Sequence, residues 1–280
     1  MAIEIGSARD ESRSPAADAI NHLVDLGKYP ILEPGSAGYV ALVEEARREL
    51  KEFGYCLLQD FIGKDRIRGL AAEARELAPL AFHNTLTGNA YLTPQDPSLP
   101  ADHPVNLTDT TALGAVAYDQ IPAGAMIRRL YDSQVFLDFV SDVLDRGPLF
   151  RYADPLGAMN IAVMKEGDHL RWHFDQTDFV VSLLIEGSGG GEYEVYPLTR
   201  SPEQENYDRV LSILQGNREG VLTLDIRPGC LVFFEGRYSL HRVTRVSGDQ
   251  VRLVALFGFD TSEGTVSSDY LRMIRYGRVN

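Results

Sequence analysis

The segment His173-Phe174-Asp175 carries residue types that bind metal ions. It opens the run HFDQTDFVVSLLI, whose apolar, β-branched end is typical of a strand. Residues two apart in a strand point to the same face, about 6.5 Å apart, so both side chains can reach one ion. A lone His-x-Asp is also common in turns and needs a third ligand. His241, in the expected strand SLHRVTRV, is the best placed of the other histidines.

Two histidines and one carboxylate on one side of an ion form the facial arrangement that suits Fe(II), because positions stay open for a co-substrate and oxygen. Zn(II), Mn(II) or Ni(II) could occupy the same ligands, so these residue types alone do not select the metal. His169 and His173 stand four apart, as zinc ligands on a helix do. The zinc protease motif, however, needs glutamate where this chain has Leu170.

Arg252 places a positive charge on the following expected strand. A two-residue or four-residue loop within 247–250 would set residue 245 opposite residue 252, and His241 and Arg252 would then face the same side of a hairpin. Their backbones would lie about 13 Å apart. A small dicarboxylate could bridge that gap, with one end on the metal and the other paired with the guanidinium. A three-residue loop would turn Arg252 to the other face.

The chain after Pro148 consists of short β-type runs separated by turn residues. We expect eight strands, in LFRYAD, AMNIAVMKEG, FVVSLLIEG, GEYEVYP, VLTLDIRPG, CLVFFEG, SLHRVTRV and VRLVALFGF. Short strands at this spacing are typical of a barrel or a double-sheet jelly roll. Residues 201–220 are the one expected helical interruption.

The first half of the chain is expected to be mostly helical. The patterns predict helices at 39–53, 64–77 and 127–145, a buried strand at 55–62, and a long polar loop at 80–115. A loop of that length is often a lid over a binding site, and its alternative role is a surface excursion.

These elements divide the chain into an N-terminal arm and one catalytic domain. The arm is expected at residues 1–36 and the domain at 37–280. Within the domain we expect a helical buttress with its loop (37–147), a β core (148–265) and a C-terminal segment (266–280).

Composition argues against several other functions. The net charge of −13 would repel a phosphate backbone, so nucleic acid is not an expected partner. Two cysteines, Cys56 and Cys230, are too few for a disulfide framework or a thiolate zinc site. The first twenty residues lack the apolar core of a signal peptide, and no apolar run is long enough to span a membrane. We expect a cytoplasmic protein that does not bind membranes.

The order of these motifs resembles the Fe(II)- and 2-oxoglutarate-dependent dioxygenases. The resemblance covers about residues 150–262 and rests on HFD (173–175), GGGEYEVYP (189–197), PGCLVFFEGRYSLHRVTRV (228–246) and Arg252. The segments YADPLGAMNIAVMKEGDHLRWHFDQTDFVVSLL and RSPEQENYD are most similar to the branch of BesD- and HalD-type amino-acid radical halogenases and their hydroxylase relatives. The resemblance implies a mainly β fold with flanking α-helices, a double-stranded β-helix of the cupin-like jelly-roll type.

The resemblance also implies a site. It implies Fe(II) on His173, Asp175 and His241, the distal carboxylate of 2-oxoglutarate on Arg252, O2 as oxidant, and ascorbate in support. In the halogenases of this branch the carboxylate position is a glycine, which leaves room for chloride. Asp175 occupies that position here, so the resemblance implies hydroxylation of an unactivated C–H bond. Desaturation or cyclisation by the same iron chemistry stays open.

The expected partner is a small-molecule substrate, by resemblance a free amino acid or a derivative. Asn160, on the preceding strand, and Gln176, directly after the ligand pair, are candidate substrate contacts. Their alternative role is to satisfy buried backbone. Two other classes remain: a metal-dependent cupin enzyme without 2-oxoglutarate, in which Arg252 would lack a carboxylate partner, and a jelly-roll binding module with a vestigial metal site.

Overall fold

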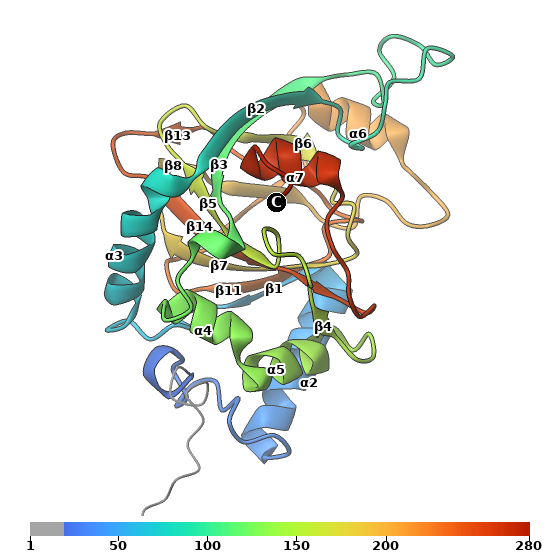
Figure 1. Cartoon of the computed structure of the whole chain (residues 1–280). Coiled ribbons are helices and arrows are strands. Elements are labelled where there is room, and N and C mark those ends of the chain that lie inside the picture. Colours follow the sequence, from blue (N-terminus) through green and yellow to red (C-terminus); the bar gives the residue numbers. More distant parts are fainter. Residues whose placement is uncertain (1–19) are drawn as a thin grey trace, which may run out of the picture.

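The computed structural model describes residues 20–280, and Figure 1 shows their arrangement. Residues 1–19, most of the predicted arm, lie outside the described part. Two antiparallel sheets form the core. The larger has the order β1 (Tyr55–Leu58), β11 (Leu231–Phe234), β7 (Val180–Glu186), β14 (Arg252–Phe257), β5 (Met159–Met164), β3 (Asp109–Val116) and β2 (Phe82–Gly88). The smaller has the order β10 (Leu222–Leu224), β9 (Tyr193–Tyr196), β12 (Leu240–Val243) and β6 (Leu170–His173).

Two short strand pairs complete the β structure of the described residues. They are β13 (Val246–Ser247) with β8 (Gly189–Gly190), and β15 (Phe259–Asp260) with β4 (Phe150–Arg151). The main sheets contain all the expected strand runs except LFRYAD, which forms only the short β4. This two-sheet arrangement confirms the predicted mainly β jelly roll.

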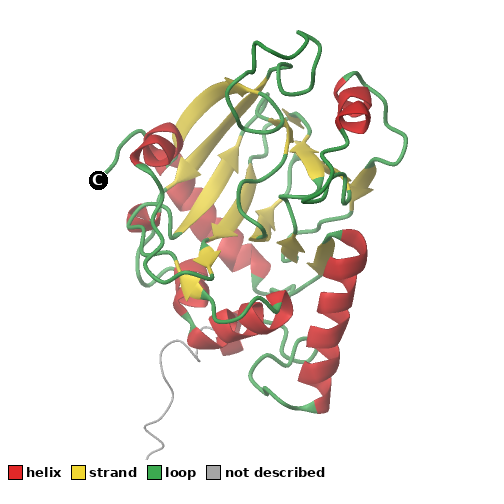
Figure 2. Ribbon diagram, turned by 90° about the vertical axis from the view of Figure 1, so that its right-hand side faces the viewer, coloured by secondary structure: helices red, strands yellow, loops and turns green. Residues whose placement is uncertain are grey.

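Helices flank the sheets, as Figure 2 shows. They are α2 (Ala37–Phe53), α3 (Ile67–Leu77), α4 (Met126–Asp132), α5 (Gln134–Leu144), α6 (Tyr207–Leu214) and α7 (Asp269–Tyr276), with short 3-10 turns η1 (Ala78–Leu80) and η2 (Tyr118–Gln120). Ser36 caps α2 by accepting a hydrogen bond from the Tyr39 backbone, and Gly54 ends it at φ 75°. Glycine suits that left-handed conformation.

The two faces of the larger sheet have different roles. Strand β14 alternates: Leu253, Ala255 and Phe257 belong to the apolar core that α2 to α5 cover, whereas Arg252 and Val254 line a cavity between the sheets. Period-two alternation is the normal consequence of the pleat. The helices therefore stabilise one face of this sheet and leave the other face to form a site.

The prediction of a loop over 80–115 is wrong in its outer parts. Strand β2 pairs with β3 over the whole length of β2, from Phe82 opposite Ala115 to Gly88 opposite Asp109. Only residues 89–108 form the connecting loop. No residue of β2 is buried, so its sequence lacks the apolar alternation that usually identifies a strand.

The expected helix at 127–145 is two helices. Ser133 is extended (φ −69°, ψ 128°) and separates α4 from α5. Its carbonyl oxygen accepts a hydrogen bond from Arg151 Nη2 at 2.6 Å. Apolar periodicity continues across Ser133, so the pattern could not reveal a break that depends on this tertiary contact.

Candidate active site

The predicted metal ligands lie together at one end of the cavity. His173, the last residue of β6, stands directly opposite His241 on β12, and their ring centroids are 4.2 Å apart. Asp175 follows β6, and its carboxylate oxygens lie 3.6 Å from Nε2 of each histidine. One candidate ligand atom from each residue lies within 4.8 Å of the others. That spacing allows all three atoms to bind one ion.

Hydrogen bonds orient both imidazoles for this purpose. His173 Nδ1 lies 2.9 Å from the Arg171 carbonyl oxygen, and His241 Nδ1 lies 2.9 Å from the Ser239 carbonyl oxygen. A carbonyl only accepts, so Nδ1 carries the proton and each Nε2 keeps a free lone pair toward Asp175. Such contacts commonly support metal-ligating histidines. The donor set therefore fits a divalent metal.

Burial and charge keep these ligands in the protonation states that a metal requires. Burial, reinforced by the neighbouring His173, lowers the pKa of His241 to about 4, so His241 is neutral near pH 7. Burial alone would raise the pKa of Asp175, but His241 and His173 outweigh it and lower that pKa to about 2. A neutral imidazole and an ionised carboxylate are the coordinating forms.

Gly236 leaves room for the Asp175 carboxylate. The Asp175 backbone N–H donates to the Gly236 carbonyl at 3.0 Å. A Cβ on residue 236 would lie 1.7 Å from Asp175 Oδ2, a distance that no side chain tolerates. Sequence reasoning missed this role, because a glycine between two strands indicates only a turn.

The cavity between the sheets has a volume of about 160 Å³. Its wall is mostly apolar and also contains His173, Asp175, His241, Arg252 and Arg275. The other lining residues are Leu113, Ala162, Met164, Leu170, Val180, Ser182, Leu184, Tyr193, Ile226, Val232, Phe234, Val243, Val254 and Leu256. That volume is below the roughly 300–1,000 Å³ of drug-sized ligand pockets. It suits a small co-substrate.

Arg252 is a buried cation in this wall, only 8% exposed. Within residues 20–280 it forms no ion pair, and its one hydrogen-bond contact is Nη1 to Met164 Sδ at 4.0 Å. Burial lowers the pKa of Arg252 to about 10, which still leaves it charged near pH 7. A buried charge without a partner is costly. An anionic ligand in the cavity would supply that partner.

The hairpin predicted for His241 and Arg252 does not form. Strand β12 belongs to the smaller sheet, whereas β14 pairs with β5 and β7 in the larger one, with Arg252 opposite Met164. The register argument is therefore wrong. Both side chains nevertheless line the same cavity, because the two sheets face each other across it.

The two candidate substrate contacts lie outside the residues that line the cavity. Asn160 shares the β5 face of Ala162 and Met164, which do line it, and its Oδ1 is buried without a hydrogen-bond partner. Gln176 is exposed, and its Nε2 donates to the Leu92 carbonyl at 3.3 Å. This hydrogen bond connects the 89–108 loop to the segment after Asp175.

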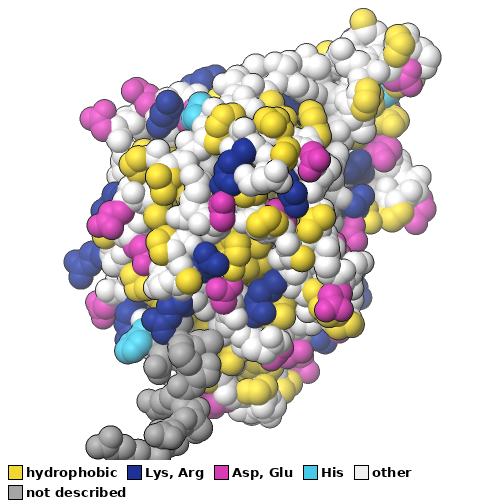
Figure 3. All heavy atoms as spheres, viewed as in Figure 1, with side chains coloured by type: hydrophobic (Ala, Val, Ile, Leu, Met, Phe, Trp, Pro, Cys, Tyr) yellow, Lys and Arg dark blue, Asp and Glu magenta, His cyan; other side chains and the backbone are white. Residues whose placement is uncertain are grey.

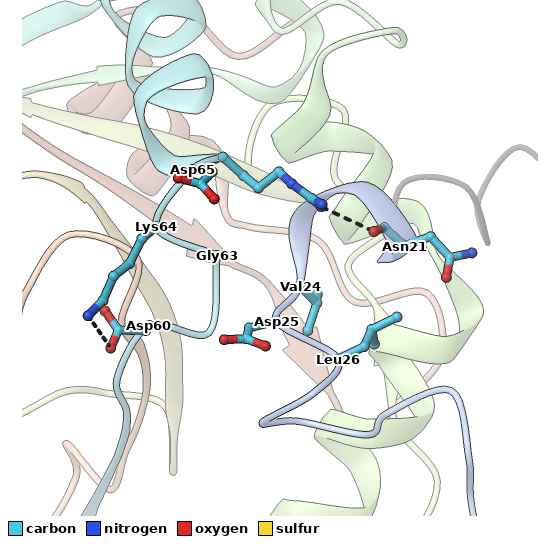
Figure 4. A pocket seen from close by; sticks show the side chains of 9 residues that line it. Asn21, Val24, Asp25, Leu26, Asp60, Gly63, Lys64 and Asp65 are labelled. Atoms are coloured by element: carbon cyan, nitrogen blue, oxygen red, sulfur yellow. Dashed lines mark hydrogen bonds and ion pairs between the residues drawn. The ribbon is translucent and has the colours of Figure 1, made fainter.

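A second hollow lies elsewhere, between residues 20–26 and the turn that precedes α3 (Figure 4). Its lining includes Asp25, Asp60 and Asp65, and the Lys64 ammonium lies 3.7 Å from Asp60. No histidine or cysteine lines it. Among the described residues, only His173, Asp175 and His241 bring three candidate ligand atoms within 4.8 Å of one another.

The surface in Figure 3 carries both signs of charge. Lysine and arginine side chains are scattered among aspartates and glutamates on this face, without a continuous basic patch. No helix among the described residues is long and apolar enough to cross a membrane.

Comparison with known families identifies the chain. The family described as Halogenase D matches residues 101–270. This range is more than half of the 280 residues. The chain belongs to the Halogenase D family. No curated protein matches the chain.

Several solved structures share the fold of this chain. A 2OG-Fe(II) oxygenase family oxidoreductase from Burkholderia pseudomallei has 15% identity and a TM-score of 0.50, with 80% of this chain and 92% of that chain covered. The α-ketoglutarate-dependent carbocyclase SnoK from nogalamycin biosynthesis has 16% identity and a TM-score of 0.53, covering 85% and 92%. HygX from Streptomyces hygroscopicus, solved with nickel and 2-oxoglutarate bound, has 12% identity and a TM-score of 0.52, covering 78% and 87%.

The fold of this Halogenase D family member is thus the double-stranded β-helix of the 2OG-Fe(II) oxygenases. Family and fold together make the chain an Fe(II)- and 2-oxoglutarate-dependent oxygenase, with O2 as the oxidant.

Proposed function

We propose that this enzyme hydroxylates an unactivated C–H bond of a free amino acid or a close derivative. The observation that carries the proposal is Asp175, whose carboxylate stands between His173 and His241. In the related halogenases, a glycine at this position leaves room for chloride. A carboxylate ligand here fills that position, so transfer of oxygen is favoured over transfer of halogen.

His173, Asp175 and His241 would hold Fe(II), and Arg252 would hold 2-oxoglutarate. The chemistry that bound Fe(II) supplies is activation of O2, coupled to decarboxylation of 2-oxoglutarate to succinate. Arg252 lines the same cavity as the ligands and lacks an anionic partner, which suits it to the distal carboxylate of the co-substrate. A bidentate guanidinium pair would fix the orientation of that carboxylate.

Apolar side chains form much of the remaining wall of the cavity. Val232, Phe234 and Val254 line it with apolar side chains, and Phe234 packs edge-on against His241 with ring centroids 4.7 Å apart. An apolar wall limits the access of water, which strengthens electrostatic interactions and limits side reactions of reactive species. The protein would therefore supply ligand geometry, an anion anchor and a largely apolar wall.

The test is turnover of purified protein with Fe(II), ascorbate, 2-oxoglutarate and O2. Succinate is measured with and without each of a panel of amino acids, and the amino acid is analysed by mass spectrometry. We expect at least one amino acid to raise succinate formation and to gain one oxygen atom. Succinate no higher than that from the Asp175→Ala and His241→Ala variants would contradict the oxygenase assignment of these residues.

A further inference from the structure

Helix α7 is held in place beside the cavity. Ser268 caps its start by accepting a hydrogen bond from the Leu271 backbone. Asn84 of β2 donates from Nδ2 to the Ile274 carbonyl at 2.9 Å. Arg272 reaches the buried Asp154 at 3.2 Å. These contacts place α7 over β2 and β3, where it is drawn in red in Figure 1.

The three arginines at this end of the chain have different environments. Arg272 pairs with Asp154, and Arg278 pairs with Asp119 at 2.6 Å. Arg275 forms no ion pair or hydrogen bond with the described residues, and its side chain instead lines the cavity that contains the metal ligands. A cation in a cavity wall without a carboxylate partner is available for an anionic ligand.

Arg275 and Arg252 differ in depth. Arg252 is buried, whereas Arg275 is exposed and therefore marks the open side of the cavity. With the co-substrate on Arg252, the cavity of about 160 Å³ has little space left for a second molecule. The primary substrate must then approach from the side of Arg275.

We propose that Arg275 is a specificity-determining residue that pairs with the carboxylate of the primary substrate. This inference rests on the proposed function and narrows it to substrates with a free carboxylate. A guanidinium binds a carboxylate through two parallel charge-assisted hydrogen bonds. An ester carries no charge, so it cannot form this charge-assisted pair.

The experiment measures binding, separately from turnover. Protein loaded with Fe(II) and 2-oxoglutarate without oxygen is titrated calorimetrically with free L-amino acids and with their methyl esters. The variant Arg275→Gln is compared with wild type. The control is Arg278→Gln, which removes a charge from the same segment but only from a surface ion pair.

We expect wild type to bind at least one amino acid at least about tenfold more tightly than its methyl ester, the scale of one charge-assisted contact. Arg275→Gln should abolish that preference, and Arg278→Gln should retain it. Arg275→Gln should also leave the KM for 2-oxoglutarate unchanged, because Arg252 remains.

Three results would overturn the inference in distinguishable ways. If Arg275→Gln keeps the wild-type preference for the free acid, the role of Arg275 is wrong while the proposed function stands. If Arg275→Gln instead raises the KM for 2-oxoglutarate, Arg275 serves the co-substrate. If no amino acid or ester binds wild type, the proposed substrate class fails, and the role of Arg275 fails with it.

Discussion

Replacement of Gly236 by alanine should disable the metal centre without unfolding the protein. The new Cβ would lie 1.7 Å from Asp175 Oδ2, whereas real Cβ contacts essentially never fall below 3.0 Å. The carboxylate oxygen must therefore move by at least 3.0 − 1.7 = 1.3 Å. Metal–ligand distances tolerate only about 0.2 Å. The Asp175 Cγ would lie 2.6 Å from the same Cβ, so the whole carboxylate group must shift and not one oxygen alone.

A misplacement on the order of 1 Å can cost a factor of about 100, so we expect Fe(II) affinity to fall by at least that factor. Anaerobic calorimetry measures it directly. A second readout is the melting temperature. A metal ion present at about 100 times its Kd stabilises the folded protein by about 2.7 kcal/mol, and an ion bound a hundredfold more weakly stabilises it far less. Fe(II) should therefore raise the melting temperature of Gly236→Ala less than that of wild type.

The matched control is Gly187→Ala. A Cβ there meets no atom within 4 Å, and the backbone of residue 187 does not have a positive φ. This variant should bind Fe(II) as wild type does. Wild-type metal affinity in Gly236→Ala would refute the reasoning that Asp175 must occupy its observed position to bind the metal.

Three further predictions concern single side chains. Arg252→Leu should raise the KM for 2-oxoglutarate by about an order of magnitude or more, because a charge-assisted pair is lost. Steady-state succinate assays measure this KM, and an unchanged value would exclude Arg252 as the anchor. Asp175→Gly should lose hydroxylation and, with chloride present, open a position for halide; product mass spectra test this, and hydroxylation at the wild-type rate would show that Asp175 is not a ligand. Burial raises the pKa of both cysteine thiols, that of Cys230 to about 12. Iodoacetamide should therefore label Cys56 and Cys230 only after unfolding, and labelling of the native protein would contradict their burial.

That the three candidate metal ligands lie together could be predicted because the pattern that indicates them is local. His173 and Asp175 are two apart at the end of a strand, and strand geometry alone brings them to one side. To predict His241 as the third candidate ligand required only the further expectation that its strand belongs to the same fold. Helices α2 and α3 and most strands were predictable for a similar reason, since burial on one face imposes a period on the sequence, whereas no helix was expected at α7.

Other features depend on contacts between distant segments. Strand β2 has no buried residue, so it left no apolar pattern. Arg252 reaches the cavity through the packing of one sheet on the other, which no hairpin register could show. Gly236 and Arg275 acquire their roles only when Asp175 and the cavity wall are in place. No local pattern in a single sequence reveals such contacts between distant segments.

The most direct test of the central claim is the mass of the product formed under ¹⁸O2 with chloride in the buffer. We expect the amino-acid product to gain one oxygen atom labelled from O2 and succinate to form in step with it, and we expect Asp175→Ala to give neither. A chlorinated product from the wild-type enzyme would contradict the claim that the Asp175 carboxylate directs this site to hydroxylation.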